Sequence, residues 1–152
     1  MEYSYKELGS DDIAPLKSLL KVFGEAFHEP ETYQGAVPSD SYLQSLLSKS
    51  HFIALTAFNG SEVVGGIAAY VLEKFEQDRR EIYIYDLAVE ESHRRKGIAT
   101  ALIKKLQNIA KERDAYLIFV QADQEDTAAI KLYTSLGTRE DAYQFDIPVV
   151  GD

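Results

Sequence analysis

Residues 82–110 contain the feature that most constrains the fold, a buried strand that passes through a short basic turn into an amphipathic helix. The first part alternates isoleucine with tyrosine and ends in the apolar run 87–89, which predicts a strand. From Ile98 onward, apolar residues recur every three or four positions while lysines occupy the other side, and this period predicts a helix. The chain therefore changes from strand to helix within a few residues.

The turn between these two elements predicts an anion-binding site. Backbone N–H groups in the first turn of a helix lack partners, and the helix dipole places positive charge there. Gly97 lets the backbone approach a ligand closely, and Arg94, Arg95 and Lys96 add positive charge. Neither the P-loop nor the GxGxxG fingerprint is present, so we interpret the turn as a cradle for a phosphate or pyrophosphate. The alternative is a solvated basic turn that caps a helix, which the acidic character of the rest of the chain disfavours.

The pattern Arg94-x-x-Gly97-x-Ala99 resembles the Gln/Arg-x-x-Gly-x-Gly/Ala signature of the GNAT superfamily of acetyl-coenzyme A-dependent N-acetyltransferases. Further blocks, such as Lys74-Phe75-Glu76-Gln77 and residues 132–137, are similar to those of class I aminoglycoside 3-N-acetyltransferases, the gentamicin-resistance enzymes. This similarity extends from about residue 22 to residue 147. It implies transfer of acetyl from acetyl-CoA to the 3-amino group of a deoxystreptamine ring, by direct attack in a ternary complex.

Composition excludes several classes of function. A length of 152 residues indicates a single domain, 1–152. Without cysteine there is no disulfide, thiolate metal site or cysteine nucleophile. The net charge of -9 opposes binding to nucleic acid or to an anionic membrane and favours a cationic small-molecule partner. No apolar run approaches the length of a membrane span and no export signal is recognisable, so we expect a cytoplasmic protein.

The remaining patterns predict an α/β protein with the order β-α-α-β-β-β-α-β-α-β, which matches the GNAT fold. We expect a mixed, mostly antiparallel sheet with helices on both faces. The expected strands are 3–8, 52–58, 62–73, 82–89, 116–122 and 143–147, and the expected helices are 12–27, 39–48, 98–110 and about 126–136. Residues 28–37 are expected to form a loop.

Single residues refine this outline. The helix 39–48 is expected to bury Tyr42 with Leu43, Leu46 and Leu47. Asn59-Gly60 predicts a hairpin, Gly65-Gly66 predicts a bulge or a close backbone approach, and Gly137 is expected to end the last helix as its C′ residue.

The implied chemistry requires a base, because an ammonium group must lose a proton before it attacks a thioester. Asp123 is the first candidate since it ends a buried strand, where ligands of α/β sheets gather; its alternative role is to cap the next helix. Glu81 is the second candidate, or else a solvated side chain. The resemblance implies that Tyr133 is the acid that protonates the departing thiolate, although its spacing fits a core aromatic residue equally well.

The resemblance also implies how the two substrates are held. The backbone of residues 87–89 would bind the pantetheine arm as an added strand, and the amides of residues 95–100 would bind the pyrophosphate. A backbone N–H of the central strand would stabilise the oxyanion. The cofactor-binding set is Leu87, Ala88, Val89, Arg94, Arg95, Lys96, Gly97, Ile98, Ala99 and Thr100.

For the cationic acceptor we expect Asp86, Asp126 and Asp146 to bind ammonium groups. Asp86 interrupts an apolar strand, so it is either re-aimed into the site by a bulge or hydrogen-bonded in a structural role.

Other interpretations remain open. The acceptor could be a polyamine or a protein amine, and the chain could be a non-catalytic module that binds coenzyme A or a partner. His28, His51 and His93 lack the spacing of metal ligands, so no metal is predicted. Homodimers are common in the resembled family, but the sequence does not identify an interface.

Overall fold

The computed structural model describes residues 2–150. The chain divides into two compact units, Met1–Gln121 and Ala122–Asp152, and each is described by itself. A single domain over residues 1–152 stays a prediction. Within the described residues, no helix is long and apolar enough to cross a membrane.

The first unit contains a five-stranded mixed sheet in the order β1-β2-β3-β4-β5. Strands β1 to β4 are antiparallel, and β5 runs parallel to β4. Their bounds are β1 (Ser4–Glu7), β2 (Phe52–Asn59), β3 (Glu62–Glu73), β4 (Arg80–Val89) and β5 (Ala115–Val120). This arrangement confirms the predicted fold class.

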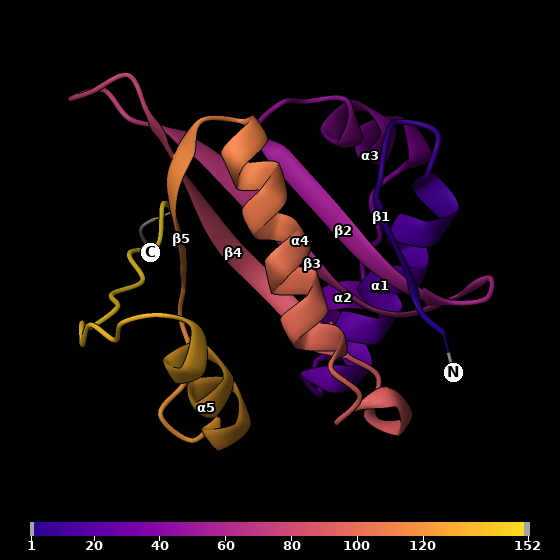
Figure 1. Ribbon diagram of the computed structural model, residues 1–152. Coiled ribbons are helices and arrows are strands. Elements are labelled where there is room, and N and C mark those ends of the chain that lie inside the picture. The colour runs from indigo at the N-terminus through magenta and orange to yellow at the C-terminus, as the bar shows by residue number, and fades with distance from the viewer. Residues whose placement is uncertain (1, 151–152) are drawn as a thin grey trace. The chain divides into compact units, whose positions relative to one another are not determined.

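Helices cover both faces of this sheet. Figure 1 shows α4 (Ile98–Glu112) across one face and α1 (Ile13–Ala26) behind the other. Each helix buries one apolar stripe: Leu102 and Leu106 of α4 and Leu19 of α1 have no exposed surface. Burying a leucine side chain contributes about 1.5–3 kcal/mol, so these stripes fix both helices on the sheet.

Two glycines allow β3 to lie close to its neighbours. A methyl group added at Gly65 would lie 2.9 Å from the carbonyl oxygen of Ala88, and one added at Gly66 would lie 2.6 Å from that of Leu55 and 2.7 Å from Leu19 Cδ1. The predicted close backbone approach is therefore confirmed.

The segment 28–37 contains a short helix, α2 (Pro30–Gln34), so the prediction of a loop was wrong. Pro30 occupies the first turn, where its missing N–H costs nothing. Tyr33 packs against Phe23 of α1 and against Phe27, the C-cap residue of that helix, with ring centroids 6.0 and 5.8 Å away. These tertiary contacts hold a turn that the local sequence alone does not specify.

Helix α3 (Asp40–Leu47) forms as predicted, with the Ser39 hydroxyl accepting a hydrogen bond from the Tyr42 N–H. Tyr42 itself is 61% exposed, so its expected burial was wrong. Leu43 and Leu47, four residues apart, form the buried stripe, and Tyr42 lies beside it.

In the second unit, α5 (Thr127–Leu136) forms as predicted. Gly137 follows it and donates its N–H to the Tyr133 carbonyl, but its φ of -150° is extended and not left-handed. The predicted strand 143–147 is absent from the described structure. A strand requires a ladder partner, and the described residues of the second unit form no other strand with which this segment could pair.

Candidate active site

The ladder between β4 and β5 stops halfway along β4. Strand β5 pairs with β4 only from Arg80 to Ile84, whereas β4 continues to Val89 against β3. In the described chain, residues 85–89 therefore have no strand on the β5 side. An open edge of this kind presents N–H and C=O groups that an extended ligand can bind as an added strand. Leu87, Ala88 and Val89 lie on this edge, in the arrangement expected for binding a pantetheine arm.

A β-bulge lies where this open edge begins. Ile84 pairs with Ala69, and the next β3 residue, Ala68, pairs with Asp86, so Tyr85 is an extra residue in β4. Paired residues share a face of the sheet, so the bulge moves Asp86 to the face opposite Ile84. The expected bulge is therefore present, whereas a role of Asp86 in the site stays a prediction.

On its new face, Asp86 meets the helices of the N-terminal part of the chain. Its neighbour Ala68 packs against the core cluster of α1, and Asp86 Oδ2 accepts a hydrogen bond of 2.9 Å from the Tyr33 hydroxyl. Burial raises the pKa of Asp86, the Tyr33 hydrogen bond lowers it and the Glu29 carboxylate raises it, with a net increase. Burial and the charge on Asp86 in turn raise the pKa of Tyr33. A carboxyl group with a raised pKa in this position is suited to accept a proton.

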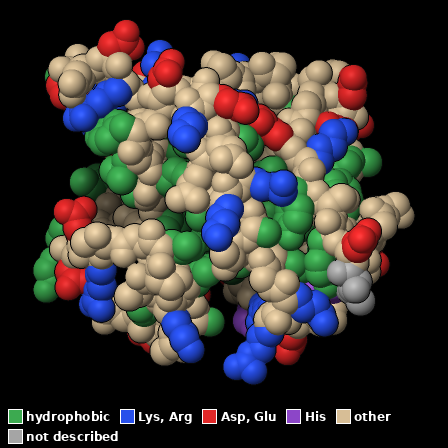
Figure 2. All heavy atoms as spheres, viewed as in Figure 1, with side chains coloured by type: hydrophobic (Ala, Val, Ile, Leu, Met, Phe, Trp, Pro, Cys, Tyr) green, Lys and Arg blue, Asp and Glu red, His purple; other side chains and the backbone are tan. Residues whose placement is uncertain are grey.

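The basic turn has the geometry of an anion-binding site. After the 3₁₀ helix η1 (Glu91–His93), Arg95 and Gly97 adopt left-handed φ angles of 63° and 79°. Gly97 is the N-cap of α4, and no side chain caps this helix or places an acidic group in its first turn. The first N–H groups are therefore available to a ligand. Figure 2 shows Lys and Arg side chains at the end of the molecule where η1 and the start of α4 lie.

The three basic residues of the turn differ in position. Arg94 Nε donates a 3.1 Å hydrogen bond to the carbonyl oxygen of Val89, so this side chain holds the turn against the end of β4. Arg95 and Lys96 are exposed. Of the remaining expected cofactor residues, Ile98 has a buried side chain, and Ala99 and Thr100 are partly buried. Their backbone N–H groups, not their side chains, would contact a pyrophosphate.

Glu81 is already held by its neighbours. Its Oε2 accepts a hydrogen bond from the Tyr116 hydroxyl and lies 3.5 Å from Lys74 Nζ. These contacts give Glu81 a structural role at the start of β4.

The other expected residues belong to the second unit. Asp126 is the N-cap of α5, where its Oδ1 accepts a 3.1 Å hydrogen bond from the Ala129 N–H. The capping role considered for Asp123 therefore belongs to Asp126. Desolvation, with the Asp126 carboxylate, raises the pKa of Tyr133 to about 12, so its phenol stays protonated near neutral pH. Asp146 Oδ1 accepts a hydrogen bond from Gln144 Nε2 at 3.0 Å.

The structure thus brings together Asp86, the open edge 87–89 and the turn 94–100 in one unit, and places Asp123, Asp126, Tyr133 and Asp146 in the other. Sequence reasoning missed Tyr33, because the segment around it was interpreted as a loop. The only local signal was an aromatic residue spaced to reach Phe23 and Phe27 of the preceding helix.

Two solved structures are similar over nearly the whole chain. An aminoglycoside acetyltransferase from an uncultured soil metagenomic sample is 53% identical, with a TM-score of 0.97 over 99% of this chain and 100% of that one. A second soil metagenomic aminoglycoside acetyltransferase, in complex with sisomicin, is 29% identical, with a TM-score of 0.89 over 97% of each chain.

Curated relatives match over a smaller region. N-alpha-acetyltransferase 30 of Xenopus laevis is 34% identical over 93 residues, which are 61% of this chain and 34% of that protein. N-acetyltransferase 8B of Rattus norvegicus is 26% identical over 89 residues, which are 59% of this chain and 40% of that protein. The chain thus spans less than half the length of these curated relatives.

The sequence profile described as the Acetyltransferase (GNAT) family matches residues 16–138, across both units of the chain. This match agrees with the mixed sheet, the open β4 edge and the anion-binding turn. The chain belongs to the acetyltransferase (GNAT) family.

Proposed function

We propose that this protein transfers the acetyl group of acetyl-CoA to an amine of an aminoglycoside, at the 3-amino group of 2-deoxystreptamine. The observation that carries the proposal is the 53% identity, over 99% of the chain, with a solved aminoglycoside acetyltransferase. The net charge of -9 suits an acceptor that carries several ammonium groups. The choice of the 3-amino group rests on the resemblance of the sequence blocks to the 3-N class.

Acetyl-CoA would bind where β4 continues beyond the end of its ladder with β5. The open backbone edge of Leu87, Ala88 and Val89 would pair with the amides of the pantetheine arm. The N–H groups of residues 95–100, with the charges of Arg95 and Lys96, would bind the pyrophosphate. Arg94 would keep the turn in place through its hydrogen bond to Val89.

The carboxylate of Asp86 is our first choice for the base, directly or through a water molecule. It is partly buried, its pKa is raised, and it lies beside the open edge where the thioester would bind. Asp123 remains a candidate, whereas Glu81 is held by Lys74 and Tyr116. The pattern of contacts therefore favours Asp86.

The reaction then proceeds in two steps. The acceptor ammonium gives its proton to the base, and the nitrogen lone pair attacks the thioester carbonyl to form a tetrahedral intermediate, whose oxyanion a β4 backbone N–H stabilises. Attack leaves one surplus proton on the nitrogen. Collapse of the intermediate breaks the C–S bond, the Tyr133 phenol protonates the departing thiolate, and the nitrogen loses its surplus proton to solvent, which gives the neutral amide. Asp86 then releases the proton that it accepted to solvent. Tyr133 has a pKa of about 12, so it carries this proton near neutral pH; the phenolate is then reprotonated from solvent.

Release of free coenzyme A thiol measures turnover without background, because the chain contains no cysteine. We would compare gentamicin and sisomicin with spermidine, a lysine peptide and a peptide with a free N-terminus. The peptide arms test the alternative suggested by the N-alpha-acetyltransferase 30 relative. NMR of the sisomicin product identifies the acetylated nitrogen.

We expect the aminoglycosides to be the best acceptors and the 3-amino group to be acetylated. Faster turnover of spermidine or a peptide would overturn the choice of acceptor, and acetylation at the 6′-amino group would overturn only the position. Binding of acetyl-CoA without acetylation of any amine would favour the non-catalytic module.

Tyr133→Phe tests the proposed acid. We expect kcat to fall by about 10²–10⁴-fold, the usual contribution of a general acid, with KM for acetyl-CoA unchanged. Tyr143→Phe, an exposed tyrosine of the same unit, is the matched control and should leave kcat unchanged. An unchanged kcat in Tyr133→Phe would remove Tyr133 from the mechanism.

A further inference from the structure

Three side chains with metal-binding groups meet in the first unit, apart from the open edge of β4. Glu62 begins β3, Glu90 follows the last residue of β4, and His93 ends η1. One ligand atom from each lies within 4.8 Å of the other two. Glu90 is the N-cap of η1 and precedes His93 by three residues, whereas Glu62 belongs to β3. Packing between these two segments brings the group together.

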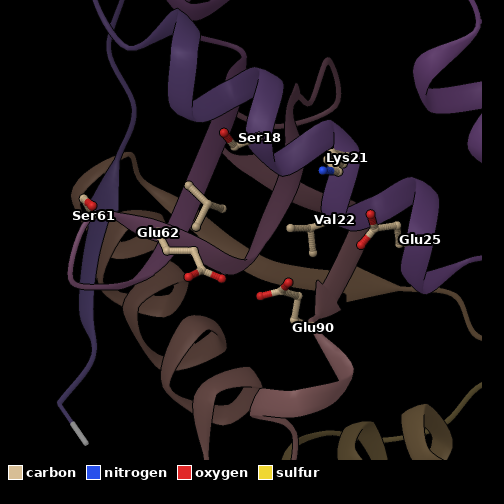
Figure 3. A pocket seen from close by; sticks show the side chains of 8 residues that line it. Ser18, Lys21, Val22, Glu25, Ser61, Glu62 and Glu90 are labelled. Carbon is tan, nitrogen blue, oxygen red and sulfur yellow. The ribbon is translucent and has the colours of Figure 1, made fainter.

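The two carboxylates line a cavity of about 290 Å³ between the sheet and α1. Figure 3 shows the carboxylates of Glu62 and Glu90 pointing into the same space, with Glu25 and Lys21 of α1 on the other side. The cavity lining thus contains three carboxylates and one ammonium group. This excess of negative charge favours a cation.

Glu90 provides an independent indication of a missing partner. Its Oε2 atom is buried and accepts no hydrogen bond from any residue in the range 2–150. A buried carboxylate oxygen without a partner is destabilising. Two facing carboxylates require a proton or a cation between them.

One ring nitrogen of His93 is held by a neighbouring tyrosine. Its Nδ1 lies 2.9 Å from the Tyr3 hydroxyl, and the two rings meet edge to face at 5.7 Å. When Nδ1–H donates to the phenol oxygen, Nε2 keeps a lone pair for a metal, as in many metal-binding histidines. The backbone fixes the same loop, because Glu90 N–H donates to Val64 O at 2.8 Å and His93 N–H donates to Glu90 O at 2.9 Å.

We propose that Glu62, Glu90 and His93 bind one divalent transition-metal ion, with zinc as the best fit. Two carboxylates and one imidazole match zinc sites with three protein ligands and a water molecule. Ligand atoms of a tetrahedral zinc site lie about 3.4 Å apart, as follows from bonds of about 2.1 Å. When the ion binds, the exposed Glu62 side chain moves towards Glu90 and His93, which shortens the distances between the ligand atoms from the present limit of 4.8 Å. The ion ties the end of β4 and η1 to β3, directly before the anion-binding turn.

The test uses untagged protein treated with a chelator and then titrated with zinc chloride by calorimetry. We expect one zinc ion per chain and a higher melting temperature with zinc. Glu90→Gln and His93→Gln are expected to weaken zinc binding at least tenfold and to lose the increase in melting temperature. Glu91→Gln, an exposed carboxylate of the same 3₁₀ helix, and His51→Gln are the matched controls and should bind like wild type.

The proposal is overturned if wild-type protein binds no zinc, or if Glu90→Gln and Glu91→Gln bind it equally. Binding of magnesium in preference to zinc would overturn the assignment to a transition metal. Melting curves recorded in chelator show whether the Glu90→Gln variant folds. If that variant does not fold, zinc binding by His93→Gln, compared with His51→Gln, tests the proposal instead. Neither readout measures acetyl transfer, so failure of the metal site leaves the proposed function unaffected.

Discussion

Removal of the Tyr33 hydroxyl tests whether Asp86 is a carboxylate held in place by a single hydrogen bond. In Tyr33→Phe the ring contacts with Phe23 and Phe27 remain, and only the 2.9 Å bond to Asp86 Oδ2 is lost. A hydrogen bond to a charged group contributes about 1.5–3 kcal/mol. Near pH 8 we therefore expect the free energy of unfolding to fall by that amount. The melting temperature should fall by roughly 3–12 °C, at about 2–4 °C per kcal/mol for a chain of this size.

The loss should depend on pH because the bond stabilises the charged form of Asp86. Burial raises the folded-state pKa of Asp86 above its ordinary value of 3.8, and the Tyr33 hydroxyl opposes this increase. Without the hydroxyl the folded-state pKa rises further. A raised pKa means that the protonated form of Asp86 favours the folded state. This contribution to the free energy of unfolding is complete below pH 3.8 and is lost as the pH rises through the folded-state pKa. The cost of Tyr33→Phe should therefore shrink towards acid pH, to about 0.5–1.5 kcal/mol for a neutral bond.

Denaturant titrations from about pH 3 to about pH 8 measure this difference, and the pH profile of kcat/KM measures its effect on the reaction. We expect the acid limb of that profile to move to higher pH. The matched control is Tyr83→Phe, because the Tyr83 hydroxyl donates at 2.7 Å to the neutral amide oxygen of Gln121. Its cost should not depend on pH. An equal pH dependence in both variants, or an acid limb moved to lower pH, would refute the role given to Tyr33.

Further variants test the fold and the cofactor site. Gly66→Ala should lower the free energy of unfolding by about 1–3 kcal/mol through overpacking, whereas Gly9→Ala, whose added methyl group would have no contact closer than 3.8 Å, should not. Asp126→Ala should destabilise α5 by about 1 kcal/mol through loss of its cap, seen as faster amide hydrogen exchange, and Asp123→Ala should leave that exchange unchanged. Gly97→Ala should cost about 1–2 kcal/mol at a φ of 79° and weaken acetyl-CoA binding in calorimetry.

The sequence was sufficient for elements whose signals are local. Helix α4 follows from its apolar period, and its start follows from Gly97, which adopts the left-handed conformation that glycine permits. The uncapped start of α4 at Gly97 could also be predicted, because unpaired N–H groups at the start are a property of every helix.

Features that depend on contacts between distant segments could not be predicted. The Tyr33–Asp86 hydrogen bond joins residues 53 positions apart, and α2 is held by its contacts with α1. The cluster of Glu62, Glu90 and His93 forms only when the start of β3 meets the turn that contains η1. Conversely, the alternation in residues 143–147 satisfies a local rule for a strand, but strand formation needs a partner that the local sequence does not specify.

The bulge at Tyr85 explains how β4 contributes both to the core and to the proposed active site. Ile82 and Ile84 are buried with 0% and 2% exposure, and in a regular strand Asp86 would share their face, because side chains alternate with a period of two. The extra residue places the carboxylate on the opposite face, beside Tyr33. The ladder with β5 also ends at Ile84, the residue before the bulge. One inserted residue thus accounts for both the open edge and the position of the carboxylate beside it. The proposed coenzyme site and the proposed base therefore depend on the same irregularity.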